Sequence, residues 1–212
     1  MKRLAVAGVL AFAFFASSPA FALALENADK MPALLDAKFI AEIWKEVIRV
    51  TNEEAPVLKL DEKMVMPKIT YAGAPPKGRE KVMAEIDTMV DKYGKVDLEK
   101  SSFAVAVYST AFFRHLPEWV SKGEPPKFFP EQAYGAIAHE FFHKTLSYQY
   151  VSGDYQHCAM VFRGTLEKVL QFIDERTVNG TKVTESVLGH VRGQCEKDSG
   201  GRIIFPSAYP SR

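Results

Sequence analysis

The sequence predicts a single α+β domain in which a small twisted sheet packs against helices. Two kinds of apolar pattern support this class, because some stretches repeat at helical spacing whereas others are short apolar runs typical of strands. The length of 212 residues suits one domain, and a hydrophobic fraction of 47% is enough to form a core. Internal repeats, low-complexity tracts and linkers are absent from the sequence.

The first half of the chain is expected to contain two helices separated by a strand. A long helix over 33–52 is predicted because apolar residues recur there every three or four positions. A strand over 64–71 follows, and Pro67 places it at a sheet edge or at a strand start. A second helix is predicted over 78–93, after a pair of prolines. The buried stripe of the first helix should comprise Leu35, Phe39, Ile40, Ile43, Val47 and Val50.

The second half is expected to contain two strands followed by helices. The runs 102–108 and 113–117 indicate strands joined by a short turn. A proline-rich loop then leads to a helix that begins at Pro130. Asp154 is a good N-cap for a further helix that runs to about residue 175. A short helix over 183–197 is expected near the end of the chain.

The N-terminus has the three regions of a secretory signal peptide. Lys2 and Arg3 precede an apolar run over 4–16, and small residues stand at positions 20 and 22. The apolar run is well short of the ~20 residues that span a bilayer, which disfavours a membrane anchor. The chain is thus divided into a signal peptide, 1–22, and a mature domain, 25–212, with cleavage after Ala22 or Ala24.

The charge balance excludes some classes of partner. Removing Lys2 and Arg3 lowers the Lys and Arg count from 27 to 25, against 26 Asp and Glu, so the formal charge becomes −1. Neither a basic excess nor a basic run exists, and therefore no nucleic acid and no anionic membrane surface is expected as a partner. The mature protein should be exported, periplasmic or extracellular, with no membrane attachment after signal cleavage.

His139, Glu140 and His143 form the most informative pattern in the chain. Residues four apart on a helix share one face, so the two imidazoles can converge on one metal ion while Glu140 points beside it. A carboxylate in that position is suited to act as a general base. The alternative is a pair of hydrogen-bonded histidines on an ordinary amphipathic helix. The buried surroundings favour the metal site, because unpaired polar groups there cost about 1–3 kcal/mol each.

A catalytic zinc site needs a third protein ligand. Glu167, His157 and Asp154 are the candidates on the segment after the motif. If two helices form an antiparallel hairpin, the level of the histidine pair falls between His157 and Glu167, somewhat nearer Glu167, which also borders the apolar stripe. Glu167 is therefore the preferred third ligand, and His157 and Asp154 stay open as alternatives.

The chain has two cysteines, Cys158 and Cys195. In an oxidising compartment they are expected to form one disulfide that ties the C-terminal region to the segment after the motif. The competing interpretation is that Cys158 supplies a thiolate to the metal.

The stretch 136–143, Ala-Ile-Ala-His-Glu-Phe-Phe-His, resembles the active-site helix of the zincin metallopeptidases. The resemblance implies that His139 and His143 bind zinc and that Glu140 is the general base. It also implies that the strand over 113–117 forms the edge of the cleft, where an extended peptide can pair. In the gluzincin branch the third ligand is a Glu on the following helix, which is in keeping with Glu167.

These observations together lead to the expectation of an exported zinc metallopeptidase that acts on a peptide or protein substrate. Its reaction needs a donor to the oxyanion, for which Tyr148, Tyr150 and Tyr155 are candidates. The alternative function is a zincin-like module that binds zinc or a partner without hydrolysing peptide bonds.

Overall fold

A computed structural model describes residues 28–54, 60, 64–79, 81–114, 127–149, 151–177 and 182–204, without the side chain of Asp154. The predicted signal peptide lies outside the described residues. The described chain is a single domain of mixed helices and strands, which confirms the α+β class. Within the described residues, no helix combines the length and the apolar composition that a membrane crossing requires.

The first long helix, α3 (Ala37–Glu54), confirms the helix predicted over 33–52. It begins after Asp36, whose carboxylate accepts a hydrogen bond from the backbone N–H of Lys38 at 2.8 Å. Of the stripe residues, Ile40, Ile43 and Val47 are buried, as the helical spacing requires.

The sheet has the strand order β1-β3-β2. Its strands are β1 (Ile69–Ala72), β2 (Ala84–Ile86) and β3 (Val105–Tyr108). The central strand, β3, pairs with β1 in parallel and with β2 in antiparallel orientation. Both β1 and β2 therefore lie at edges of the sheet.

The helix predicted over 78–93 is wrong, because this stretch contains β2 and irregular chain instead. Its apolar residues fit helical spacing, but Met89 and Tyr93 are 51% and 78% exposed and do not form a core face. The backbone of the stretch is satisfied by the neighbouring strand: the N–H of Asp87 donates to the carbonyl of Ala104 at 2.8 Å. Sheet pairing across the chain thus overrides the local helical pattern.

The strand predicted over 102–108 is confirmed as β3, but its predicted pairing is wrong. Instead of forming a hairpin with β3, β4 (Phe113–Arg114) pairs with β5 (Lys127–Phe128). A 3₁₀ turn over Ser109–Ala111 separates β3 from β4. Residues 115–117 of the predicted strand lie outside the described residues.

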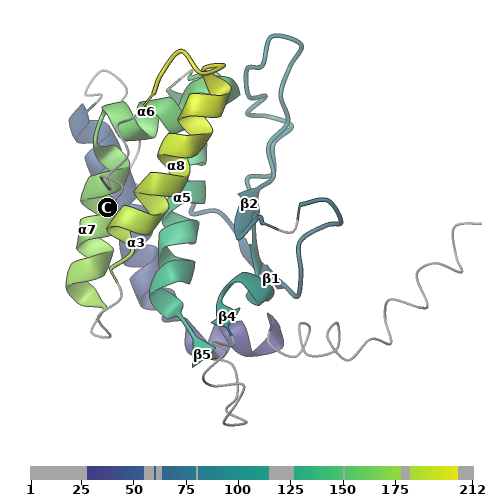
Figure 1. Cartoon of the computed structure of the whole chain (residues 1–212), viewed down its shortest axis with the longest axis vertical. Coiled ribbons are helices and arrows are strands. Elements are labelled where there is room, and N and C mark those ends of the chain that lie inside the picture. Colours follow the sequence, from purple (N-terminus) through teal and green to yellow (C-terminus); the bar gives the residue numbers. More distant parts are fainter. Residues whose placement is uncertain are drawn as a thin grey trace, which may run out of the picture.

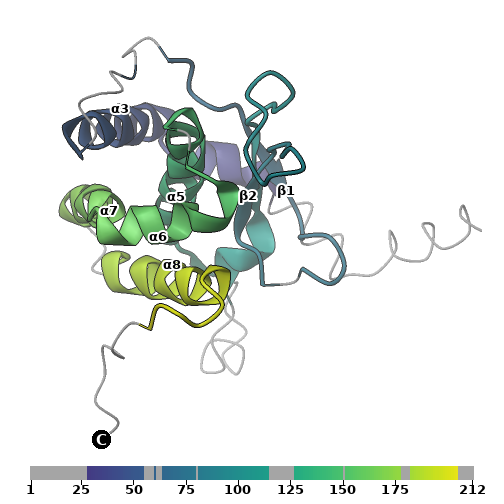
Figure 2. The same ribbon diagram turned by 90° about the horizontal axis from the view of Figure 1, so that it is seen from above.

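The central element is α5 (Pro130–Tyr148), which is buried along most of its length. It contacts α3, α7 and α8 as well as β2. Figures 1 and 2 show α5 between the sheet on one side and the other helices on the opposite side. Phe141 and Phe142 are fully buried in this core, and the ring of Phe141 meets that of Trp44 edge to face at 5.2 Å between centroids.

The long helix predicted from Asp154 to about residue 175 is divided into two. A 3₁₀ turn, η2 (Gly153–Tyr155), leads into α6 (Gln156–Phe162), and α7 (Thr165–Arg176) follows. The break lies at Gly164, whose φ of +63° is left-handed and ends α6. The last helix, α8 (Thr184–Asp198), confirms the helix predicted over 183–197.

The disulfide between Cys158 and Cys195 is present, with a Cα–Cα distance of 4.7 Å. It joins α6 to α8 and confirms the predicted pairing of the two cysteines. Because both sulfur atoms are in this bond, Cys158 offers no thiolate to a metal ion.

Candidate metal site in a cleft beside strand β2

His139 and His143 project from one face of α5, as their spacing predicts. Their Nε2 atoms are 3.2 Å apart, and their ring centroids are 4.8 Å apart. Two ligands of a tetrahedral zinc ion at Zn–N distances of about 2.0–2.1 Å would have nitrogen atoms roughly 3.3–3.4 Å apart. The pair therefore has the separation that a shared zinc ion requires.

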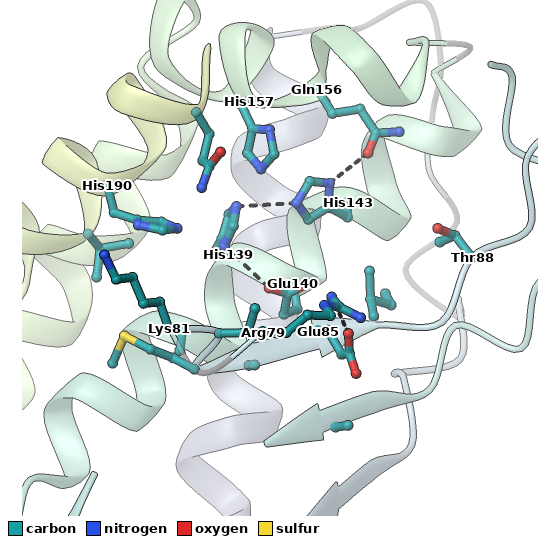
Figure 3. A pocket seen from close by; sticks show the side chains of 18 of the residues that line it. Arg79, Lys81, Glu85, Thr88, His139, Glu140, His143, Gln156, His157 and His190 are labelled. Atoms are coloured by element: carbon teal, nitrogen blue, oxygen red, sulfur yellow. Dashed lines mark hydrogen bonds and ion pairs between the residues drawn. The ribbon is translucent and has the colours of Figure 1, made fainter. Parts of the chain in front are cut away.

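The third histidine of this cluster is His157, at the start of α6. Its ring centroid lies 5.3 Å from that of His139 and 4.8 Å from that of His143. The potential ligand atoms of the three histidines all lie within 4.8 Å of one another, so the group could hold a metal ion (Figure 3). His139 and His143 lie one helical turn apart on α5, whereas His157 comes from the separate helix α6.

Glu167, the preferred third ligand from sequence, is not part of this cluster. It lies in the first turn of α7 and accepts a hydrogen bond from Gln171 on the same helix at 3.4 Å. The hairpin estimate assumed one continuous helix after Asp154, whereas the break at Gly164 separates α7 from α6. The geometry therefore groups His157, and not Glu167, with His139 and His143, and the side chain of Asp154 lies outside the described residues.

Hydrogen bonds fix how two of the imidazoles present their nitrogen atoms. The Nδ1 of His143 is 2.7 Å from Oε1 of Gln156, whose amide nitrogen donates to Ser147 and Val151. Since that amide nitrogen is the donor, its oxygen must accept the proton on Nδ1. The Nδ1 of His157 likewise lies 2.7 Å from a carboxylate oxygen of Asp198. In the neutral tautomers set by these contacts, both Nε2 atoms keep a lone pair for a metal ion.

Burial keeps the histidines on α5 neutral. It lowers the pKa of His139 to about 3, and the neighbouring His157 and His190 lower it further. Burial also lowers the pKa of His143 to about 4. Both rings are therefore uncharged at neutral pH, and the uncharged imidazole is the form that binds metal ions.

Glu140 lies against the histidine cluster and against β2. One of its carboxylate oxygens is 3.3 Å from Nδ1 of His139, and the backbone N–H of Ile86 donates a hydrogen bond to the carboxylate. Burial raises the pKa of Glu140 to about 7, although the nearby His143 and His157 partly oppose this effect. A carboxyl group with such a pKa can both accept and release a proton near neutral pH.

The cluster opens into a cleft of about 1370 Å³. One wall is β2 with the residues next to it, and another is a polar face of α8. His190 belongs to this face, with its ring centroid 6.3 Å from that of His139 (Figure 3). Burial lowers the pKa of His190, as do His157 and Lys197 nearby.

The edge strand beside the cleft is β2, and the described part of the strand predicted over 113–117 lies elsewhere. Phe113 and Arg114 do not line the cleft, and they pair with β5. On either side of β2, the carbonyl of Met83 accepts a hydrogen bond from the N–H of Tyr108 in β3, and the N–H of Asp87 donates to the carbonyl of Ala104, next to β3. By alternation, the backbone groups of Ala84 and Ile86 point to the opposite edge, which agrees with the hydrogen bond from Ile86 to Glu140.

Sequence reasoning missed the residues that come from α8. His190 and Asp198 are far from the motif in the chain, and the helix predicted over 183–197 carried no assigned role. One signal was present: Ser186, His190, Gln194 and Lys197 recur at helical spacing and form a polar face. Of the tyrosines considered as oxyanion donors, Tyr148 and Tyr155 do not line the cleft, and Tyr150 lies outside the described residues.

Comparison with protein-family models, with curated proteins and with solved structures gives no match for this chain. The function is therefore inferred from the cleft itself.

Proposed function

We propose that this chain is an exported zinc-dependent metallopeptidase of the zincin type, with His139, His143 and His157 as the zinc ligands. The observation that carries the proposal is the meeting of three imidazoles and a buried glutamate in a cleft bordered by an edge strand. The signal-like N-terminal sequence supports export, and a disulfide is typical of proteins in oxidising compartments.

The donor set suits zinc. Three imidazoles are one of the ligand sets found in catalytic zinc sites, whereas a structural site usually has four protein ligands. Among the described residues, the potential metal-binding group at the cleft contains three histidines. When bound, zinc supplies Lewis-acid polarisation of a substrate carbonyl and lowers the pKa of a coordinated water to about 7. Three protein ligands would leave the fourth position of a zinc ion open to water, whereas four would close the site. The three-histidine group therefore favours a hydrolase over the alternative of a zinc-binding module without turnover.

Glu140 is the proposed general base and acid. Its raised pKa allows the carboxylate to take a proton from the attacking water and then to deliver it to the leaving amine. The hydrogen bond from Ile86 and the contact with His139 hold the carboxylate on the cleft side of α5. Proton transfer would thus occur beside the three imidazoles.

The edge of β2 is the proposed site for the substrate backbone. An extended peptide that pairs with the backbone of Ala84 and with the carbonyl of Ile86, whose N–H is bonded to Glu140, would form main-chain hydrogen bonds and would lie next to Glu140. This position would hold the bond to be cut within reach of Glu140. Such positioning lowers the barrier because the entropy of bringing the reacting groups together is lost on binding and not in the reaction step. His190 faces the same space from α8, and we assign to it the role of donor to the oxyanion.

The decisive experiment compares Glu140→Gln with His139→Ala and His143→Ala in the purified mature protein. Glu140→Gln should retain one zinc per chain and lower peptide hydrolysis by about 10²-fold or more, because the base is lost while the ligands remain. Each histidine variant should lose zinc and activity together. Stoichiometric zinc in the double histidine variant, or unchanged hydrolysis by Glu140→Gln, would refute the proposal.

A further inference from the structure

The edge that borders the cleft is longer than β2 itself. Beyond β2, alternate residues keep their backbone bonded to the chain that returns to β3: Asp87 to Ala104 at 2.8 Å, Met89 to Asp97 at 2.7 Å and Asp91 to Lys95 at 2.8 Å. Between the last two, Val90 lies opposite Val96 in an antiparallel bridge. Because backbone groups alternate in direction along an extended chain, those of Thr88 and Val90 point outward. The outer edge therefore runs over 84–90.

The outward groups beyond β2 are free and border the cleft. No residue that the structure describes forms a hydrogen bond with the backbone of Thr88 or Val90. Both residues line the cleft, and Val90 is 57% exposed. A bare edge is a template for pairing with another chain, and proteins usually block it with charged residues or proline. Neither device is present among the residues whose backbone faces outward here: Ala84, Ile86, Thr88 and Val90.

The metal site lies near one end of this edge. Glu140 bonds to the N–H of Ile86, so the reacting groups stand beside β2. Toward Val90 the edge continues for about four residues, or roughly 13 Å in an extended chain. In the other direction the chain turns just before β2, since the N–H of Val82 donates to the carbonyl of Arg79 at 2.9 Å. The edge thus has a long arm on one side of Glu140 and a short one on the other.

The long arm runs beside open space and has a defined end. Figure 3 shows Thr88 on the far side of His143 from His139. The arm ends where the N–H of Gly153, before α6, donates to the carbonyl of Gly94 at 3.2 Å. On the wall formed by α8, a Cβ atom added to Gly193 would meet no atom within 4 Å. The cleft therefore has room for a chain beside the edge.

We infer that the natural substrate is an extended polypeptide segment of roughly seven residues, which pairs as an added strand along 84–90 and has most of its length on one side of the bond that is cut. This inference rests on the proposed peptidase function and adds a substrate class to it. Dipeptides would reach only the part of the edge beside Glu140 and should be poor substrates. Folded domains should be resistant, because their backbone groups are already paired.

Pairing can be tested without turnover in the zinc-loaded Glu140→Gln protein. The probe is a pool of fluorescein-labelled random octapeptides, whose binding is followed by fluorescence anisotropy. Adding Thr88→Pro should weaken binding about tenfold, because proline removes the outward N–H and its ring obstructs the edge. The matched control is Lys92→Pro, which should leave binding unchanged. Lys92 does not line the cleft, and it is the second residue of the turn Asp91–Gly94, a position that favours proline.

A second pair of variants tests the edge without changing the backbone. Val90→Lys places a charge on the long arm and should also weaken binding, because charged residues oppose strand addition. Its control is Tyr93→Lys, at a residue of the same loop that is 78% exposed and does not line the cleft. Far-UV circular dichroism and zinc content should be the same in all of these variants.

Cleavage by the wild-type protein provides the second measurement. Mass spectrometry of a digested random octapeptide library should show cuts near one end only, with at least about three residues left on one fixed side of the cut. Unchanged binding by both edge variants, or cuts spread evenly along the peptides, would overturn the inference. Binding that depends on the long arm, with no cleavage by the wild type, would instead refute the peptidase function and leave the strand pairing supported.

Discussion

The assignment of His157 as third zinc ligand can be tested against Glu167, which the sequence alone favoured. The perturbations are His157→Ala and Glu167→Ala, each made in the mature protein. His157 lies in the cluster with His139 and His143, whereas Glu167 bonds to Gln171 on the surface of α7. Only the first substitution removes an imidazole from the cluster.

The expected magnitude follows from the number of ligands. Structural zinc sites with four protein ligands bind with about 10–16 kcal/mol, or roughly 3 kcal/mol for each ligand. Losing one of three histidines should therefore weaken zinc affinity by ~10²-fold or more. Glu167→Ala should leave the affinity unchanged within about a factor of two, because the side chain lies outside the cluster.

Competition with a chromophoric chelator at fixed pH measures both affinities. Far-UV circular dichroism of each metal-free variant controls for loss of fold. A large loss of affinity in Glu167→Ala with no change in His157→Ala would refute the geometric argument, and it would return Glu167 to the ligand set.

Three further outcomes are expected. Asp198→Asn should lower zinc affinity by about 10- to 100-fold, because Asp198 orients His157; an unchanged chelator titration would contradict this role. Replacing Cys158 and Cys195 with Ser should lower the free energy of unfolding, measured by urea titration, by about 4 kcal/mol. This is the chain-entropy value for a sequence separation of 37. Equal urea midpoints for the wild type and the variant would show that the link adds no stability. Gly193→Ala should raise that free energy by up to about 1 kcal/mol, since the helix gains propensity and the added Cβ meets no atom within 4 Å; a lowered thermal midpoint would count against the open cleft.

Parts of this fold that depend on local pattern could be predicted from the sequence. The helices α3 and α5 follow from apolar spacing and from Pro130 at the first helical position. The pairing of His139 with His143 follows from the period of the helix, and the disulfide follows from the count of cysteines. In each case the information lies within a few residues or in the composition.

Parts that depend on distant contacts could not be predicted in this way. The residues of β2 carry an apolar spacing that also fits a helix, and only pairing with β3 decides between the two. The break at Gly164 separates Glu167 on α7 from His157 on α6, and the ring of His157 is held by Asp198, 41 residues later in the chain. The hairpin estimate included neither the break nor the distant partner, so it favoured Glu167.

The bond between Cys158 and Cys195 has a practical consequence for any assay of this protein. The bond joins α6, at the residue after His157, to α8, three residues before Asp198. The third histidine is therefore held by a covalent link as well as by its contact with Asp198. Dithiothreitol would therefore act twice, since its thiolates compete for zinc and also reduce the link. Added zinc alone should restore protein treated with a chelator, whereas protein treated with dithiothreitol should also require reoxidation.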